Sequence, residues 1–599
     1  MPLPTEQSKS GSKITHSNTT LMASDSPAAN GIKPVIYQML PRLFSNYNEN
    51  CIPDGDIAQN GCGKLNDITP EILKTIKDLG ITHVWYTGII EHAHATDYSA
   101  HGITPDNPAV VKGKAGSPYA ISDYYDIDPD VAVDVENRIG EFEELVDRTH
   151  QAGMKVVIDF VPNHVARRYH SDAAPVGIED FGQGDDVTRF FDSRNNFYYI
   201  TRQKFEPTFD YGDYYEFPAK ASGNDCFNAF PGRNDWYETV KLNYGIDYGD
   251  GSHHFDPIPP TWIKMLHILR YWAAKGIDAF RCDMVFMVPL EFWEWAIPQV
   301  KATYPHILFI AEIYDVNLYR DFLYRGGFDY LYDKVNLYDT LRAVQCHNVS
   351  AAKITDCWQR IDGIGNRMLN FLENHDEQRF ASQQYAGAAD RVLPSLIVSS
   401  MISTAPFMIY AGQELGEPAA DAEGFSGADG RTTIFDYWSV PTLRRWLNNG
   451  KADGGASYPQ ERNLRGIYRQ VLNLLNSEKA LSQGEFFDLM YVNFNNQQFS
   501  PHRHYAFMRR HKNEVLLIAV NFSDQSAQVA INIPALAIEM YGIKPGTRQA
   551  TELLTGRKAK ISIDSNTPAE THLAPWGAAI WKFDAAKTTR QSSRTTTKS

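Results

Sequence analysis

The segment VVIDFVPNH, residues 156–164, decides the interpretation of this 599-residue chain. A short run of aliphatic residues ends in an acid, and a polar Asn-His pair follows directly. Such a run is too short for a helix and predicts a buried strand with polar residues at its C-terminal end. Comparable apolar runs occur at seven other places: residues 35–37, 83–86, 279–280, 307–310, 330–332, 368–372 and 407–409.

Amphipathic helical patterns separate these runs. Between residues 135 and 146 the apolar side chains share one helical face, and Gly153 follows where the helix is expected to end. Residues 262–272 show the same pattern before Gly276. Strands that alternate with helices indicate a parallel sheet, and eight such units predict an α/β fold, a (β/α)8 TIM barrel.

The spacing of the runs predicts the domain organisation. One interval, between residues 158 and 279, is too long for a single helix, so we expect an inserted subdomain after strand 3, at about 165–258. After about residue 484 alternating apolar residues predict an antiparallel β-sandwich over 484–584. The barrel would then span 32–483. The polar ends, 1–31 and 585–599, are expected to be disordered tails.

Aromatic side chains are dense in the predicted insert. Aromatic rings can stack on sugars, but most of those in a small subdomain form its core. For any single ring of this segment we therefore expect a core position.

Composition excludes several classes of protein. Arg and Lys number 57 and Asp and Glu 72, a formal charge of −15, which argues against a nucleic-acid partner. The six cysteines include no C-x-x-C pair, so we expect reduced thiols; only Cys51 and Cys62 are close enough in sequence to suggest a disulfide. Neither a zinc site nor a redox pair is indicated.

The uncharged stretch 392–413 has the length of a membrane span. Two prolines and a change from helical to strand spacing favour a buried helix followed by a buried strand, so no membrane partner is expected. The first twenty residues lack the apolar core of a secretion signal. We therefore expect a cytoplasmic protein, or a secreted one whose signal has been lost.

Ionisable side chains follow four of the predicted strands. These residues are Asp159, Arg281 with Asp283, Glu312, and His375 with Asp376. In a (β/α)8 barrel the C-terminal strand ends share one mouth, where active sites lie. A single acid there is usually solvated or paired, but acids from four strands indicate a site. Paired carboxylates without a phosphate-binding loop or a metalloprotease motif fit glycoside hydrolysis.

The segments VVIDFVPNH, GIDAFRCD, ILFIAE and FLENHD resemble, in this order, four signature regions of the α-amylase family, glycoside hydrolase family 13. The similarity extends over roughly residues 33–584. It implies that Asp283 is the nucleophile and Glu312 the general acid and then base, and that Asp376 holds sugar hydroxyls. Arg281 is expected to favour the ionised nucleophile, and apolar neighbours to raise the pKa of Glu312.

The same resemblance implies the substrate contacts. His164 and His375 match the histidines that bind the sugar at the cleaved bond, and Tyr119 matches the tyrosine that stacks on it. Asp159 is interpreted as an internal orienting acid. Asn163 matches the asparagine that binds calcium between barrel and insert in many members, so calcium is the expected cofactor.

Several positions depart from the family pattern. Phe286 and Met287 stand where many members have a Lys-His pair, which puts binding beyond the cleaved bond in doubt. Ser117 stands where many members have a histidine. A second calcium loop at Asn48, Asp54, Asp56 and Asn60 is possible, although an Asx-rich turn is favoured.

The resemblance implies a retaining hydrolase of α-1,4-glucosidic bonds in starch or maltodextrins, with an α-glucan or maltooligosaccharide as its partner. An α-glucosidase, a neopullulanase and a glucanotransferase of the same family remain alternatives. A non-catalytic relative that binds glycans or partners a transporter is a remote one, because such relatives typically lose the catalytic acids. A metal-dependent barrel hydrolase would need histidine clusters at the strand ends, where only His164 and His375 occur.

Overall fold

The computed structural model describes residues 31–425 and 427–586. Eight parallel strands close into a barrel in the order β1-β14-β13-β12-β11-β10-β3-β2. The strands are β1 (Val35–Met39), β2 (His83–Tyr86), β3 (Lys155–Phe160), β10 (Ala279–Cys282), β11 (Leu308–Ala311), β12 (Tyr330–Tyr332), β13 (Met368–Phe371) and β14 (Phe407–Tyr410). Each predicted run forms one of these strands, so the predicted (β/α)8 barrel is confirmed.

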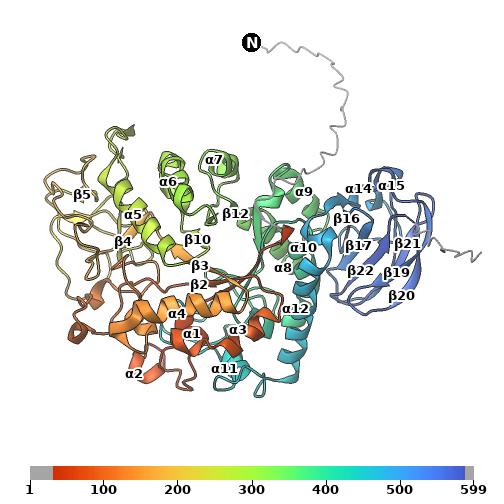
Figure 1. The fold of residues 1–599 in the computed structure, drawn as a ribbon, viewed down its shortest axis with the longest axis horizontal. Coiled ribbons are helices and arrows are strands. Elements are labelled where there is room, and N and C mark those ends of the chain that lie inside the picture. Colours follow the sequence, from red (N-terminus) through yellow and green to blue (C-terminus); the bar gives the residue numbers. More distant parts are fainter. Residues whose placement is uncertain (1–30, 426, 587–599) are drawn as a thin grey trace, which may run out of the picture.

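Helices pack around the barrel with their apolar faces inward (Figure 1). They are α3 (Pro70–Lys77), α4 (Arg138–Gln151), α5 (Pro260–Ala274), α6 (Leu290–Thr303), α7 (Tyr319–Tyr324), α8 (Asp339–Cys346), α9 (Lys353–Arg360), α10 (Leu393–Met401) and α12 (Pro459–Ser477). Shorter helices are α1 (Pro41–Phe44), α2 (Ile57–Asn60), α11 (Pro441–Leu447) and α13 (Lys479–Ser482). The uncharged stretch 392–413 contains buried α10 and then β14, as expected. None of the described helices is long and apolar enough to cross a membrane.

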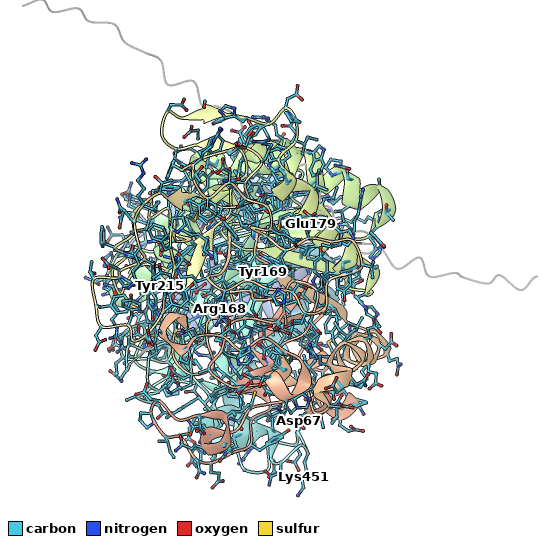
Figure 2. All side chains as sticks on the ribbon, turned by 90° about the vertical axis from the view of Figure 1, so that its left-hand side faces the viewer. Asp67, Arg168, Tyr169, Glu179, Tyr215 and Lys451 are labelled. Carbon is cyan, nitrogen blue, oxygen red and sulfur yellow. The ribbon has the colours of Figure 1, made fainter. Side chains whose placement is uncertain are left out.

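The long segment between β3 and α5 contains six short strands that pair antiparallel. They are β4 (His164–Ala166), β5 (Tyr199–Ile200), β6 (Ala219–Lys220), β7 (Thr239–Lys241), β8 (Ile246–Asp247) and β9 (Ser252–His253). The predicted bounds of the insert, 165–258, fall within this segment, which we call the inserted segment. Many of its aromatic rings form a separate apolar core around Tyr198 and Phe205. Tyr215 is an exception: it is 71% exposed and lies on the outer face shown in Figure 2.

Two further long connections were not anticipated, so the expectation of a single irregular interval is wrong. Residues 87–137 connect β2 to α4, and residues 411–440 connect β14 to α11. The two loops are joined by backbone hydrogen bonds, such as that from the Ala115 N–H to the Phe435 carbonyl (3.0 Å). Such contacts between irregular segments produce no periodic pattern in the sequence. A Cβ on Gly116, whose φ is +71°, would lie 1.7 Å from the Ala93 carbonyl oxygen. Only glycine fits at this position of the loop that carries Tyr119.

The C-terminal part is an antiparallel sheet, as predicted, in the order β15-β16-β17-β22-β19-β20, with a second layer of only two strands, β18 and β21. The strands are β15 (Glu485–Asp488), β16 (His504–His511), β17 (Glu514–Asn521), β18 (Ala527–Ile531), β19 (Gly546–Glu552), β20 (Lys558–Ile563), β21 (Ala569–Leu573) and β22 (Ala578–Asp584). Helices α14 (Met490–Asn493) and α15 (Ala535–Met540) interrupt them. Figure 1 shows these sheets at the end of the molecule opposite the inserted segment.

All six cysteines lie within the described residues and are free, so Cys51 and Cys62 form no disulfide. The predicted tails fall outside the described residues except for Gly31, Ala585 and Ala586.

Candidate active site

The C-terminal ends of the barrel strands surround a cavity of about 390 Å³. Five of the predicted site residues line it directly: Tyr119, Asp283, Glu312, His375 and Asp376. His164, at the start of the inserted segment, also lines it. The structure thus brings together side chains that are up to 257 positions apart in the sequence, because parallel strands share one edge.

Arg281 connects the acids beneath the cavity. Its guanidinium lies 2.8 Å from the Asp283 carboxylate, 2.8 Å from the Glu312 carboxylate and 3.6 Å from the Asp159 carboxylate. Its Nε also donates to the Tyr332 hydroxyl (3.2 Å) at the end of β12. Since the arginine side chain is 1% exposed, these acids supply the negative charge that a buried guanidinium requires.

Asp283 and Glu312 differ in their electrostatic surroundings. Burial raises the pKa of Asp283 above its ordinary value, while Arg281 and a hydrogen bond from Glu312 oppose the rise. Burial raises the pKa of Glu312 further, to about 7, and the neighbouring Asp283 charge adds to this. Of these two acids, Glu312 is therefore the one whose pKa favours the protonated form near neutral pH.

Two further donors fix the Glu312 side chain. The Tyr314 hydroxyl donates to one carboxylate oxygen, and the Met284 N–H donates to the other (2.9 Å). Met284 directly follows Asp283 and has a φ of +42°, a strained value for a residue with a side chain. This backbone conformation directs the Met284 N–H towards the Glu312 carboxylate, so the residue next to the first acid holds the second.

Asp376 lies at the open side of the cavity, with 41% of its side chain exposed. Its carboxylate is 3.1 Å from His375 Nε2. Burial and, after it, the neighbouring Glu312 carboxylate raise the pKa of Asp376 to about 7. Its position at the rim allows contact with a bound ligand as well as with the protein.

Tyr119 and His375 form one wall of the cavity. Their rings stack with centroids 5.2 Å apart, and the Tyr119 hydroxyl is 2.6 Å from His375 Nε2. His375 Nδ1 is 2.7 Å from the side-chain amide nitrogen of Gln38, at the end of β1. The Tyr119 hydroxyl also donates to Asp159 (3.3 Å), which agrees with an orienting role for that acid. Burial and Arg281 lower the pKa of His375, so the imidazole is neutral.

The predicted calcium ligand, Asn163, already contacts a cation. The Lys241 ammonium donates to the Asn163 side-chain oxygen, lies 2.6 Å from the Asp225 carboxylate and donates to the Met287 carbonyl (3.0 Å). Amide, carboxylate and carbonyl oxygens are ligands that calcium prefers. Because a buried lysine occupies their centre, the residues present do not fit a calcium ion at this position.

His164 is adjacent to this group. β4 pairs with β7 so that His164 faces Lys241 across the ladder. Burial and the nearby Lys241 and Lys112 charges lower the pKa of His164 to about 3. A neutral imidazole therefore lines the cavity, 5.1 Å from the Trp236 ring measured between centroids.

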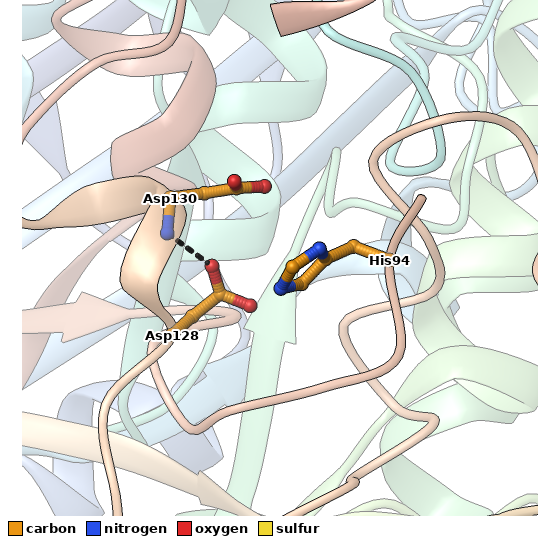
Figure 3. A group of neighbouring side chains, drawn as sticks. All are labelled: His94, Asp128 and Asp130. Atoms are coloured by element: carbon orange, nitrogen blue, oxygen red, sulfur yellow. Dashed lines mark hydrogen bonds between the residues drawn. The ribbon is translucent and has the colours of Figure 1, made fainter. Parts of the chain in front are cut away.

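Within the described residues, one other group has the composition of a metal site: His94, Asp128 and Asp130 (Figure 3). Both Asp130 carboxylate oxygens accept hydroxyl donors, from Tyr98 (2.9 Å) and Tyr437 (2.6 Å). Asp128 accepts the Asp130 N–H (2.9 Å). Burial lowers the pKa of His94, but Asp130 and Asp128 outweigh it, so the pKa is raised overall. The raised pKa favours the positively charged form of His94 beside these two acids.

The acidic loop before α2 forms turns. Asp56 accepts the Gln59 N–H (2.9 Å) and caps α2, and the Asn60 side chain donates to the Ile52 and Tyr437 carbonyls. These contacts fit the favoured Asx-rich turn.

Several cavity residues were not predicted from the sequence. Tyr314, in the cavity wall, lies just beyond the end of β11. Gln38, which contacts His375 but does not line the cavity, lies near the end of β1, so an inspection of every strand end would have found both. Lys112, Glu238 and Arg431 come from long loops and carry no local signal. Ser117, where many members have a histidine, lines the same cavity.

Comparison with known proteins decides the family. The model of the alpha amylase catalytic domain matches residues 38–436. The chain belongs to the alpha-amylase family. It is thus an alpha-amylase-family glycoside hydrolase that acts on alpha-glucans, and the resemblance of its four strand-end segments is confirmed.

Two relatives with similar sequences share less than a quarter of their aligned residues with this chain. A cyclomaltodextrinase of Thermoanaerobacter pseudethanolicus is 23% identical over 517 residues, which cover 83% of this chain and 71% of that protein. Alpha-amylase 2 of Dictyoglomus thermophilum is 22% identical over 506 residues, with the same coverage. A noncanonic maltogenic alpha-amylase from Thermotoga neapolitana has a similar fold, with a TM-score of 0.59, 20% identity and coverage of 92% of this chain and 99% of that one.

Proposed function

We propose that this protein hydrolyses α-1,4-glucosidic bonds in starch or maltodextrins with retention of configuration, as an α-amylase-like enzyme. The observation that carries the proposal is that Asp283 and Glu312 line one cavity and share the Arg281 guanidinium, which lies 2.8 Å from each carboxylate. Retaining glycosidases have carboxyl groups only about 5 to 5.5 Å apart, whereas inverting enzymes keep a wider gap for water. Two carboxyls that contact one guanidinium fit the closer spacing of the retaining arrangement.

The proposed reaction has two steps. In the first, Asp283 attacks the anomeric carbon while Glu312 gives its proton to the leaving oxygen, so the glycosidic bond breaks and a glycosyl ester forms. In the second, Glu312 takes a proton from water, the water oxygen attacks the anomeric carbon, and the ester bond to Asp283 breaks. Asp376 at the rim would bind the sugar hydroxyls, and Arg281 would stabilise each charged carboxylate in turn.

One observation favours an exo-acting α-glucosidase as a second candidate. The Lys112 ammonium lies 2.9 Å from the Glu238 carboxylate, which connects the β2–α4 loop to the inserted segment at the cavity wall. A buried ion pair in this wall would take up space that further sugar units could otherwise occupy. Relatives of both types occur: Maltase 1 of Drosophila virilis is 27% identical over 266 residues.

Product analysis tests the proposal. Maltoheptaose, soluble starch, pullulan and maltose are incubated with the enzyme, and products and their anomers are followed by NMR. We expect mixed short maltooligosaccharides that first appear as α anomers. Glucose as the first product would instead support the α-glucosidase, panose from pullulan the neopullulanase alternative, and lengthened products the transferase. Initial β anomers would refute retention.

A further inference from the structure

A separate cavity of about 410 Å³ lies in the inserted segment. We call it the outer pocket. None of the described residues that line it also lines the catalytic cavity. Its volume falls within the roughly 300–1,000 Å³ range of small-ligand pockets. Six of its lining residues are aromatic: Tyr169, Phe181, Phe197, Tyr199, Tyr215 and Phe217. Figure 2 shows Tyr169 and Tyr215 on the face of the molecule that the inserted segment forms.

The outer pocket has buried rings in its floor and exposed rings at its rim. Phe197 and Tyr199 are buried in the floor. At the rim, Tyr215 is 71% and Phe217 56% exposed, whereas Glu216 between them is buried. Exposed rings of this size cost the free protein hydrophobic free energy, which a ligand that covers them recovers. Two exposed rings at the edge of one pocket therefore indicate a binding surface.

The charged groups of the outer pocket neutralise one another. Among the described lining residues the charged side chains are Glu216 and Lys220, whose carboxylate and ammonium lie 3.5 Å apart. Behind the lining, Arg167 contacts Glu216 (2.7 Å) and Asp185 accepts a tyrosine hydroxyl (3.0 Å), which adds one charge of each sign. The Lys220 ammonium also lies 5.2 Å from the Phe197 ring centroid, where a cationic ligand would otherwise bind. The ligand that fits this lining is neutral.

The lining also combines apolar ring faces with hydrogen-bonding groups. Tyr169, Tyr199 and Tyr215 each contribute a hydroxyl as well as a ring. A glucose unit has an apolar face of C–H groups, which packs on an aromatic ring, and hydroxyls that need polar partners when they lose water. A neutral sugar thus matches both properties of the lining. Since the chain belongs to a family that acts on α-glucans, an α-glucan is the neutral sugar chain that this protein meets.

We propose that the outer pocket binds a section of an α-glucan chain, as a second binding site that holds long substrates on the enzyme. The inference goes beyond the proposed function, because the outer pocket contains none of the three acids. His164, in the catalytic cavity, and Tyr169, in the outer pocket, are five positions apart at β4, so their Cα atoms are at most about 18 Å apart. A polymer bound at one site is present at a raised effective concentration at the other.

Hydrogen exchange measured by mass spectrometry shows where maltoheptaose binds. The Asp283→Asn enzyme is used so that the ligand is not consumed. Residues 215–217 lie outside any helix or strand, so their amides exchange fast in the free protein. At a maltoheptaose concentration about ten times Kd, exchange in a peptide that covers residues 211–220 should slow by up to about tenfold. A peptide that covers residues 283–290 reports binding in the catalytic cavity in the same sample.

Two variants remove the rim of the outer pocket. Tyr215→Ala and Phe217→Ala, each combined with Asp283→Asn, should weaken Kd at the outer pocket at least about fivefold and keep Kd at the catalytic cavity. In the active enzyme the same two variants should raise the KM for soluble starch by up to about fivefold and leave the KM for maltotriose unchanged. The control is Tyr491→Ala, which removes a tyrosine ring of similar exposure (59%) on α14 and should change none of these values.

The two peptides separate this inference from the proposed function. Slower exchange at residues 283–290 without any change at 211–220 would overturn the second site and leave the proposed function intact. Equal protection of residues 211–220 in both rim variants and the control would overturn the placement of the site at these rings. An unchanged KM for starch in both rim variants would overturn its role in holding long substrates. If neither peptide is protected, the proposed function fails, and the inference fails with it.

Discussion

Replacement of Lys241 by methionine tests whether a lysine holds the barrel and the inserted segment together. The Lys241 side chain is 2% exposed and its ammonium contacts three oxygens, from Asn163, Asp225 and Met287. Methionine keeps most of the apolar length but removes the charge and all three contacts. The Asn163 oxygen and the Met287 carbonyl would then lose a charged donor.

The size of the effect follows from these contacts. Loss of one partner of a fully buried charged pair costs about 3–5 kcal/mol, but Asp225 is 39% exposed, so its share is reduced by solvent. A loss of roughly 1 kcal/mol for each of the two uncharged acceptors and less than that for Asp225 gives about 2–3 kcal/mol. For a barrel of this size that corresponds to a decrease in Tm of at least about 2 °C.

Thermal unfolding followed by circular dichroism, with and without a calcium chelator, measures this effect. We expect Lys241→Met to lower Tm and chelation to leave the wild type unchanged. The KM for maltoheptaose should rise several-fold, because the Asn163 side-chain amide lies 3.1 Å from Nδ1 of His164, which lines the cavity. Lys451→Met is the control, since Lys451 is exposed (Figure 2). An unchanged Tm in Lys241→Met, or a wild type destabilised by chelation, would refute the reasoning.

Three further predictions concern the acids and the domain contact. Asp283→Asn should reduce turnover of maltoheptaose by roughly 10⁴-fold or more while oligosaccharide binding persists, and near-normal rates would exclude its role as nucleophile. Since the Tyr314 hydroxyl stabilises ionised Glu312, Tyr314→Phe should raise the pKa of Glu312 above about 7. The alkaline limb of kcat/KM should accordingly move up by about 0.5 to 1 pH unit, and a shift to lower pH would contradict this sign. Arg509 donates to the Ile402, Ala480 and Gly484 carbonyls. Arg509→Met should therefore destabilise the contact between the C-terminal sheet and the barrel by about 2 kcal/mol. Equal rates of limited proteolysis in the variant and the wild type would argue against this prediction.

The sequence alone predicted the barrel and the positions of the acids. Strands and amphipathic helices depend on the local period of apolar residues, so each of the eight runs could be identified without knowledge of the others. The rule that active sites lie at the C-terminal strand ends then placed Asp283, Glu312 and Asp376 at one mouth. The raised pKa of Glu312 was expected from its apolar neighbours, and burial is its first cause in the structure.

Only the tertiary structure decided the contacts between segments far apart in the chain. Lys241 meets Asn163 because β4 and β7 pair in one particular register, and it meets Met287 because the inserted segment packs on the end of β10. Lys112 contacts Glu238 because the β2–α4 loop lies against the inserted segment, to which the Asn107 side-chain amide donates at the Asp213 carbonyl (3.0 Å). Irregular segments of this kind have no period in the sequence that would predict the contact. Local patterns determine which residues form strands and helices. Long-range packing determines which cation lies beside Asn163 and what lines the space around the acids.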